Sequence, residues 1–398
     1  MKRFGKVLLV ILLVLATAAT SSVLTAKWVA GQYEEDLRTS RIRYKMDQLT
    51  ELVEKYFIDD YDLQAMELAA ADGAANAMVE ATGDRWSYYI SAKDMQSYEE
   101  SMNNEYVGIG VTIREVEGGM EIMEVVSGGP AQEAGVQVGD ICTEVQGEQT
   151  TVLGMTGTQD RVRGEEGTTV HMTFRRGGET YSVDVERRAI VMPVAEWEML
   201  EDQIALISIY NFDSHCADQT LSCVDEALDQ GAQAILFDVR FNGGGYKDEM
   251  VEILDVLLPE GDIFRSVDYA GREDVDTSDA ACLEIPMAVL VNEESYSAAE
   301  FFAAALQEYG VAEVVGVQTS GKGNFQYTLE LGDGSAVALS CGKYYTPSGR
   351  SLTDVGVTPD LEIDLSYEDF EALYYSALAR EDDEQLQAAA GLLREKIS

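Results

Sequence analysis

The stretch from Ser295 to Gln326, SYSAAEFFAAALQEYGVAEVVGVQTSGKGNFQ, decides how the second half of this chain is organised. The apolar run just before it, 287–291, is short and bounded by polar residues, which predicts a buried strand. Ser297 opens a helical pattern that ends at the next glycine. A second apolar strand, 311–317, then leads into a small polar loop that carries Lys322 between two glycines. A serine at a strand-to-helix turn and a lysine in the following loop form a candidate nucleophile–base pair.

The same alternation of strands and helices begins upstream of this stretch. The apolar run 234–240 predicts a buried strand that ends in a glycine loop at 243–245, and a helix is expected over 247–257. Glycines in such a loop leave backbone N–H groups accessible and let a substrate approach closely. The repeated order of strand, loop and helix predicts an α/β core, whose functional residues lie in loops beyond the strand ends.

Composition excludes several classes of function. The formal net charge of −44 repels phosphate backbones, so no nucleic-acid partner is expected. The chain has two histidines, His171 and His215, and five cysteines without a CxxC motif, which argues against zinc sites and histidine-based triads. His215 and Cys216 are adjacent and cannot face each other as base and nucleophile. No metal and no cofactor is therefore expected.

The N-terminal segment has the pattern of an export signal. Residues 1–6 are basic, and 7–26 contain no charge and are strongly apolar in their first half. A cleaved signal peptide and an uncleaved membrane anchor both fit this pattern. The unbroken tail of the run favours the anchor, with the catalytic domain on the extracytoplasmic side. Cleavage would instead give a secreted protein.

A β-rich module begins near residue 106. Strands are expected over 109–114, 120–126, 168–174 and 180–187. The segment 129–140 reads GPAQEAGVQVGD, a pattern typical of PDZ domains, which bind a peptide C-terminus by adding it as a strand. Three residues are expected to supply the backbone cradle for the peptide carboxylate: Gly108, Ile109 and Gly110.

A serine hydroxyl becomes a nucleophile only when a base removes its proton. Lysine can act as that base if burial lowers its pKa toward neutrality. The loop 318–324, which carries Lys322, contains no acidic residue, and Gln326 follows closely enough to orient the lysine by a hydrogen bond. An alternative explanation for Ser297 is structural, because Ser297 and Glu300 also form an S-x-x-E capping box.

An acyl-transfer site also needs donors for the oxyanion. The backbone N–H of Ala298 lies at the start of the expected helix, where it has no intrahelical partner. A glycine amide from 243–245 is a candidate for the second donor.

Four ordered motifs resemble those of the carboxyl-terminal processing peptidases, serine peptidases of the S41 type. The family pattern D-L-R-x-N-P-G-G corresponds to DVRFNGGG at 238–245, and S-A-S-A-S-E corresponds to SYSAAE at 295–300. The pattern T-x-G-K-G-x-x-Q corresponds to TSGKGNFQ at 319–326, and Y-Y-T-P-S-G-R is unchanged at 344–350. The resemblance covers roughly residues 35–390.

The resemblance implies specific roles. Ser297 would be the nucleophile, Lys322 the general base and Gln326 the residue that positions the lysine. Gly244 and Ala298 would line the oxyanion hole.

The chain departs from the family pattern at three positions. Gly243 replaces the usual proline, Tyr296 replaces an alanine and Ala299 replaces a serine. None of these changes removes a catalytic group, but Tyr296 is expected to reshape the pocket, and Gly243 leaves open which glycine serves the oxyanion.

The predicted fold class is an α/β peptidase core with an inserted β-rich PDZ domain, N-terminal helices and a C-terminal helical tail. The predicted function is a Ser-Lys endopeptidase that cleaves exported or membrane-associated proteins near their C-termini. A catalytically silent PDZ scaffold at the cell surface is the alternative. The N-terminal and C-terminal helices are candidate contacts of a homodimer. The expected segments are a signal anchor or signal peptide (1–27), a helical region (28–104), the PDZ domain (105–190), the peptidase core (191–365) and the helical tail (366–398).

Overall fold

The computed structural model describes residues 21, 25, 27 and 41–397. The chain divides into two compact units, 1–82 and 83–398. In the first unit, residues 41–56 are helical and α2 spans Leu63–Glu80, with no buried residue in α2. Within the described part of the chain, no helix has the length and apolar character needed to cross a bilayer. The predicted anchor at 7–26 lies, apart from two residues, outside that part.

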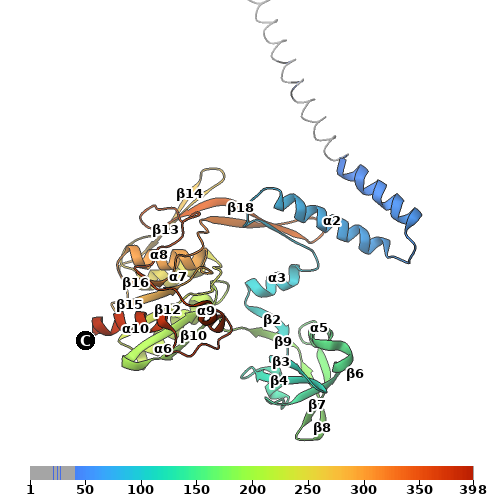
Figure 1. The fold of residues 1–398 in the computed structure, drawn as a ribbon, viewed down its shortest axis with the longest axis horizontal. Helices are drawn as coiled ribbons and strands as arrows, with labels where there is room; N and C mark the ends of the chain where they lie inside the picture. Colours follow the sequence, from blue (N-terminus) through green and yellow to red (C-terminus); the bar gives the residue numbers. More distant parts are fainter. Residues whose placement is uncertain (1–20, 22–24, 26, 28–40, 398) are drawn as a thin grey trace, which may run out of the picture. The chain divides into compact units, whose positions relative to one another are not determined.

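The centre of the second unit is a six-stranded sheet in the order β10-β11-β12-β15-β16-β19 (Figure 1). All neighbours in this sheet pair in parallel except the edge strand β10, which is antiparallel to β11. The carboxyl ends of β12, β15 and β16 therefore meet at one edge of the sheet, where their loops come together. The strands are β10 Ala195–Met199, β11 Ile204–Ile209, β12 Ala234–Asp238, β15 Met287–Val291, β16 Ala312–Gly316 and β19 Leu361–Glu362.

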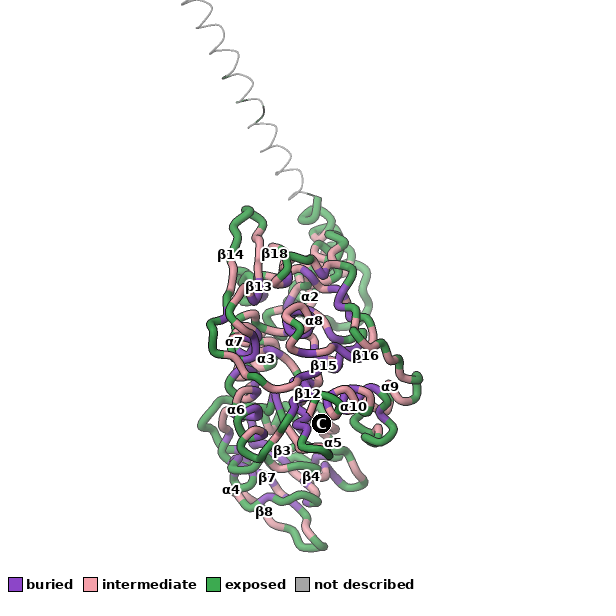
Figure 2. Tube along the Cα trace, turned by 90° about the vertical axis from the view of Figure 1, so that its left-hand side faces the viewer, coloured by how far each residue is buried: buried purple, intermediate pink, exposed green. Residues whose placement is uncertain are grey.

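Helices cover both faces of this sheet because alternate strand residues point to opposite sides. Ile207, Phe237 and Val289 pack with residues of three helices: α6 Cys216–Asp229, α7 Lys247–Leu257 and α8 Ala298–Glu308. The neighbouring positions, such as Leu236 and Leu290, pack against α10 Glu384–Ile397. The first nine residues of α8 are all buried, as in a helix enclosed on every side. Figure 2 shows this concentration of buried residues along the central strands and helices.

A second, five-stranded sheet contains a long hairpin whose turn lies at 332–334. Its path is β1-β18-β13-β14, with β17 also paired to β18. The predicted C-terminal helical tail consists of two helices, α9 Tyr367–Tyr374 and α10. The strands are β1 Tyr88–Ile90, β13 Gly261–Asp268, β14 Glu273–Ser278, β17 Asn324–Glu330 and β18 Ala336–Tyr345.

The β-rich module is connected to the rest of the unit by a two-stranded ribbon, β2 Glu105–Gly108 paired with β9 Arg188–Val191. Its sheet has the order β3-β4-β5-β7-β8, with β6 beside β5, and encloses its own apolar core. Helix α3, Met95–Met102, precedes the ribbon. These elements confirm the predicted fold class. The remaining elements of the module are β3 Val111–Val116, β4 Gly119–Val125, α4 Pro130–Glu133, β5 Ile141–Val145, β6 Glu148–Gln149, α5 Thr150–Val162, β7 Thr169–Arg176 and β8 Glu179–Glu186.

Candidate active site

A cavity of about 630 Å³ lies where the loops after the parallel strands converge. It is lined by Gly244 from the loop after β12, by Ser297 from the turn after β15, and by Lys322 from the loop after β16. Gln326 at the start of β17 lines the same cavity. The structure thus gathers at one site four residues that the sequence singles out.

Ser297 has an unusual backbone conformation, with φ 58° and ψ −125° at the N-cap of α8. A non-glycine residue in this region is strained, and such strain is found mainly where function requires it. Ser297 and Glu300 form the capping box that the sequence predicts: the Ser297 N–H donates to Glu300 Oε2 at 3.0 Å, and the Glu300 N–H also donates to the Ser297 carbonyl at 2.9 Å. An ordinary N-cap has extended backbone, so capping alone does not explain the conformation of Ser297.

Gly244 lies directly against the serine turn. A Cβ added at Gly244 would lie 2.7 Å from the Ser297 Cβ and 2.9 Å from the Ala298 nitrogen, and its φ of +87° favours glycine. Its own N–H donates to Asn242 Oδ1 at 2.8 Å. The Ala298 N–H begins α8 beside this glycine, so the two expected oxyanion donors are adjacent, and the Gly244 amide is engaged within its own turn.

Glu300 joins the serine turn to the lysine loop. Its carboxylate is fully buried and accepts hydrogen bonds from the Thr319 hydroxyl at 2.5 Å, the Gly321 N–H at 2.7 Å and the Lys322 N–H at 2.8 Å, besides the Ser297 N–H. Burial raises its pKa, and these hydrogen bonds act in the opposite direction. The sequence identifies Glu300 only as a capping residue. Its link to the lysine loop is missed, because the other donors lie about twenty residues away.

The Lys322 ammonium lies beside two aromatic rings that contact each other, with ring centroids 5.4 Å apart. Its Nζ is 5.0 Å from the centroid of Trp86 and 5.5 Å from that of Tyr296. Burial lowers the pKa of Lys322 below its ordinary value, and the charges of Glu300 and Asp84 act in the opposite direction. The lysine is thus shifted toward the neutral form that a general base requires. Sequence analysis assigned no function to the aromatic turn at 84–89, because its role depends on contacts with residues more than 200 positions away.

Two further groups in the cavity bear on its chemistry. The Gln326 side chain donates to Ser340 Oγ at 3.4 Å, so in this conformation its amide is directed to β18. Burial, with a smaller contribution from Glu249, raises the pKa of Asp213 to about 7. Among the described residues, no group of three or more His, Cys, Asp or Glu is arranged to hold a metal ion.

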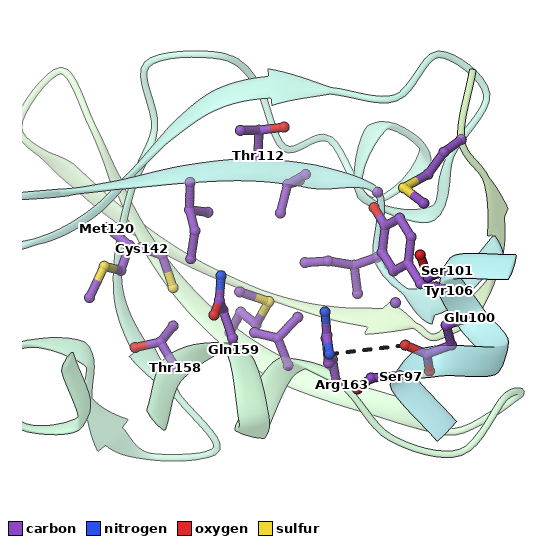
Figure 3. Close-up of a pocket in the computed structure, with 18 residues that line it drawn as sticks. Ser97, Glu100, Ser101, Tyr106, Thr112, Met120, Cys142, Thr158, Gln159 and Arg163 are labelled. Carbon is purple, nitrogen blue, oxygen red and sulfur yellow. Dashed lines mark ion pairs between the residues drawn. The ribbon is translucent and has the colours of Figure 1, made fainter. Parts of the chain in front are cut away.

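The PDZ module has a separate groove of about 440 Å³, drawn in Figure 3. Gly108, Ile109 and Gly110 line it, so the predicted carboxylate cradle opens onto a cavity. Arg163, just after α5, lies in the same groove and pairs with Glu100 of α3 at 4.0 Å (Figure 3). The Arg163 guanidinium in this groove is thus paired with the carboxylate of Glu100, which lines the groove as well.

Comparison with known families agrees with this fold. Residues 203–363 match peptidase family S41, and residues 107–186 match a PDZ domain. The chain is therefore a serine peptidase of family S41 with a PDZ domain. It is similar to C-terminal processing proteases of the CtpA-like group, and the predicted family, fold class and enzyme class are confirmed.

The individual relatives are distant. A probable CtpA-like serine protease of Staphylococcus saprophyticus is 27% identical over 370 residues, which cover 91% of this chain and 74% of that protein. The Staphylococcus haemolyticus protein of the same description is 30% identical over 297 residues, 74% of this chain and 60% of that protein. Among solved structures, a photosystem II D1 C-terminal processing protease is 22% identical, with a TM-score of 0.46, over 85% of this chain and 92% of its own.

Proposed function

We propose that this protein is a Ser-Lys endopeptidase in which Ser297 is the nucleophile and Lys322 the general base. The observation that carries the proposal is the strained Ser297 at the start of α8, in one cavity with a lysine whose pKa is lowered by burial. Neutral Lys322 takes the hydroxyl proton as Ser297 Oγ attacks the scissile carbonyl, and then gives that proton to the leaving amine. Water, with its proton taken by the same lysine, hydrolyses the acyl-enzyme.

The oxyanion of this reaction needs donors beside Ser297. The Ala298 N–H is one, because it lies at the positive end of α8. Gly244 becomes the second donor when its amide leaves Asn242 Oδ1 and turns to the substrate. Gln326 acts as the lysine-positioning group when it exchanges Ser340 for Lys322. Substrate binding would therefore complete the site by local rearrangement.

The substrates proposed are exported or membrane-associated proteins cleaved near a free C-terminus. The groove at Gly108–Gly110, with Arg163 beside it, supports binding of a terminal carboxylate. Helix α3 lines both cavities, with Glu100 at the groove and Tyr98 at the catalytic cavity, so occupancy of the groove would gate the site through this helix. The uncharged segment 7–26 supports a membrane anchor with the peptidase on the extracytoplasmic side.

The catalytic proposal is tested by incubating the purified protein with unstructured polypeptides beside Ser297→Ala and Lys322→Ala variants. Both substitutions are expected to abolish cleavage, and the terminal fragments identify the cut site. Cleavage that persists in both variants would overturn the mechanism. Binding of C-terminal peptides without cleavage by any form would favour the scaffold function.

The PDZ proposal is tested with peptides that end in a free or an amidated carboxyl group. The peptide with a free carboxyl group is expected to bind, and the amidated peptide is not. The Arg163→Gln variant is expected to discriminate less between the two peptides. Equal binding of both peptides would show that the groove does not recognise a terminal carboxylate. The location of the protein is tested by adding an external protease to intact cells, which is expected to degrade the peptidase domain but no cytoplasmic marker.

A further inference from the structure

Two departures from the family pattern lie in contact. A Cβ added at Gly243 would lie 2.6 Å from the Tyr296 hydroxyl oxygen and 2.9 Å from its Cζ. Both distances are shorter than any side chain tolerates, so the Tyr296 ring occupies the space beside this position. Gly243 does not have positive φ, and its backbone conformation therefore does not demand glycine. The glycine is explained by the tyrosine, and the two exchanges form one steric unit.

The same ring forms part of the enclosure of Lys322. The centroids of Tyr296 and Trp86 are 5.4 Å apart, and the Lys322 Nζ approaches both rings. The Arg85 guanidinium lies 4.2 Å from the Trp86 centroid and donates to the Ser320 carbonyl at 3.0 Å. The turn that supplies Trp86 is thereby fastened to the lysine loop.

We propose that Tyr296 is a positioning residue for the base: its ring fills the place that a proline at position 243 would occupy and shields one side of Lys322 from water. This inference rests on the proposed role of Lys322 in catalysis. Removal of the ring opens a path for water to the ammonium. A proline at 243 in the absence of the tyrosine refills part of that space.

Two effects of the ring on Lys322 oppose each other. The face of an aromatic ring attracts a cation, which stabilises the ammonium by roughly tenfold. Exclusion of water disfavours the ammonium by about a thousandfold or more when burial is complete. The negative charges of Glu300 and Asp84 also favour the ammonium. Exclusion of water is therefore the dominant effect, in agreement with the lowered pKa of Lys322.

The first experiment follows the titration of Lys322 without using activity. In a Ser297→Ala background, the rate of acetylation of Lys322 by acetic anhydride is measured against pH by mass spectrometry. Replacement of Tyr296 by alanine is expected to move the midpoint upward by about one pH unit, since one of two aromatic walls is lost. Tyr296→Phe keeps the ring and is expected to leave the midpoint in place. Tyr269→Ala, at an exposed tyrosine on the β13–β14 hairpin, is the matched control. An unchanged midpoint in Tyr296→Ala overturns the inference, whatever the protein cleaves.

The second experiment is a double-mutant cycle on kcat/KM. Tyr296→Ala is expected to lower activity about tenfold on the acid side of the pH profile. Gly243→Pro alone is expected to inactivate through its collision with the ring, but in the Tyr296→Ala protein it should restore part of the lost activity. Thermal unfolding of each variant shows whether it folds. If the kcat/KM of the double variant is no higher than the product of the fractional activities of the two single variants, positions 243 and 296 do not act as one steric unit. Loss of activity in Ser297→Ala tests the proposed function separately.

Discussion

Replacement of Glu300 by glutamine should lower both the free energy of unfolding and the catalytic activity. The buried carboxylate presents two oxygens, one to the Thr319 hydroxyl and the Gly321 N–H, the other to the N–H groups of Ser297 and Lys322. Glutamine keeps one acceptor oxygen and turns an NH₂ group toward the other pair of donors. With the NH₂ group on the side of Ser297 and Lys322, two hydrogen bonds are lost, because both partners there are N–H donors. On the other side the NH₂ group can donate to the Thr319 hydroxyl oxygen, and only the bond from the Gly321 N–H is lost.

The magnitude follows from the hydrogen bonds lost. A hydrogen bond to a charged group contributes about 1.5–3 kcal/mol, so losing one or two costs roughly 1.5–6 kcal/mol. The neutral amide is easier to bury than the carboxylate, which offsets part of this cost. We expect the free energy of unfolding to fall by about 2–4 kcal/mol. Because Glu300 holds the backbone of both Ser297 and Lys322, kcat/KM should fall by about 100-fold as their geometry loosens.

Denaturant unfolding and steady-state cleavage of a model polypeptide test both numbers. Glu313→Gln is the matched control, because Glu313 pairs with Lys396 at 3.0 Å and its side chain is 38% exposed. That exchange should change stability by about 0.5 kcal/mol or less. If Glu300→Gln unfolds at the same denaturant concentration as the control, the carboxylate does not hold the two loops together and the reasoning fails.

Three other substitutions are expected to have defined effects. Gly244→Ala puts a Cβ 2.7 Å from that of Ser297 and should lower kcat/KM about 100-fold; near-normal turnover would show that the turn adapts freely. The pKa of Asp213 in the folded protein is raised to about 7 from 3.8. The folded state therefore has no penalty from this side chain below pH 3.8, and it loses stability as the pH rises from 3.8 to about 7. Asp213→Asn should therefore stabilise the protein by roughly 1–4 kcal/mol at pH 8 and little at pH 3.5, a trend that a pH-independent difference would contradict. Lys322 has a lowered pKa, so below pH 10.5 the unfolded chain binds the proton more readily. Lys322→Met should raise Tm at pH 7, with the gain disappearing above pH 10.5, and no gain at pH 7 would argue against a desolvated lysine.

The core could be predicted because its signals are local. Strands such as β12 and β15 are continuous apolar runs, and the parallel order of such strands places their loops at one edge. The proximity of Ser297 and Lys322 follows from that topology. The polar hairpin of β13 and β14 carries no comparable apolar run and was not predicted.

Features that depend on distant contacts could not be predicted from local patterns. The helical tail is interrupted before α10, where Asp383 lies buried in an ion pair with Arg240 at 2.9 Å. Arg240 also pairs with Asp238 at 2.7 Å. Through its pair with Asp383, Arg240 connects the loop after β12 to the C-terminal segment. Likewise, the role of Trp86 appears only when the turn that carries it reaches Lys322. Composition and periodicity contain no information about such pairs.

The acidity of the chain and the need for a neutral lysine are compatible for a physical reason. Among the described residues, the carboxylates other than Asp140, Glu300 and Asp383 are exposed or half-buried, and water and salt screen their charge over about 8–10 Å. The Lys322 pKa therefore depends on the few charges that are close and poorly screened, chiefly Glu300 and Asp84. The carboxylate of Glu300 accepts hydrogen bonds from N–H and hydroxyl groups of the two loops, including the Lys322 backbone N–H, and forms no ion pair with the ammonium within residues 41–397. Glu300 thus holds nucleophile and base in place while its charge opposes the lowering of the Lys322 pKa. Burial outweighs this opposition, because the pKa lies below its ordinary value.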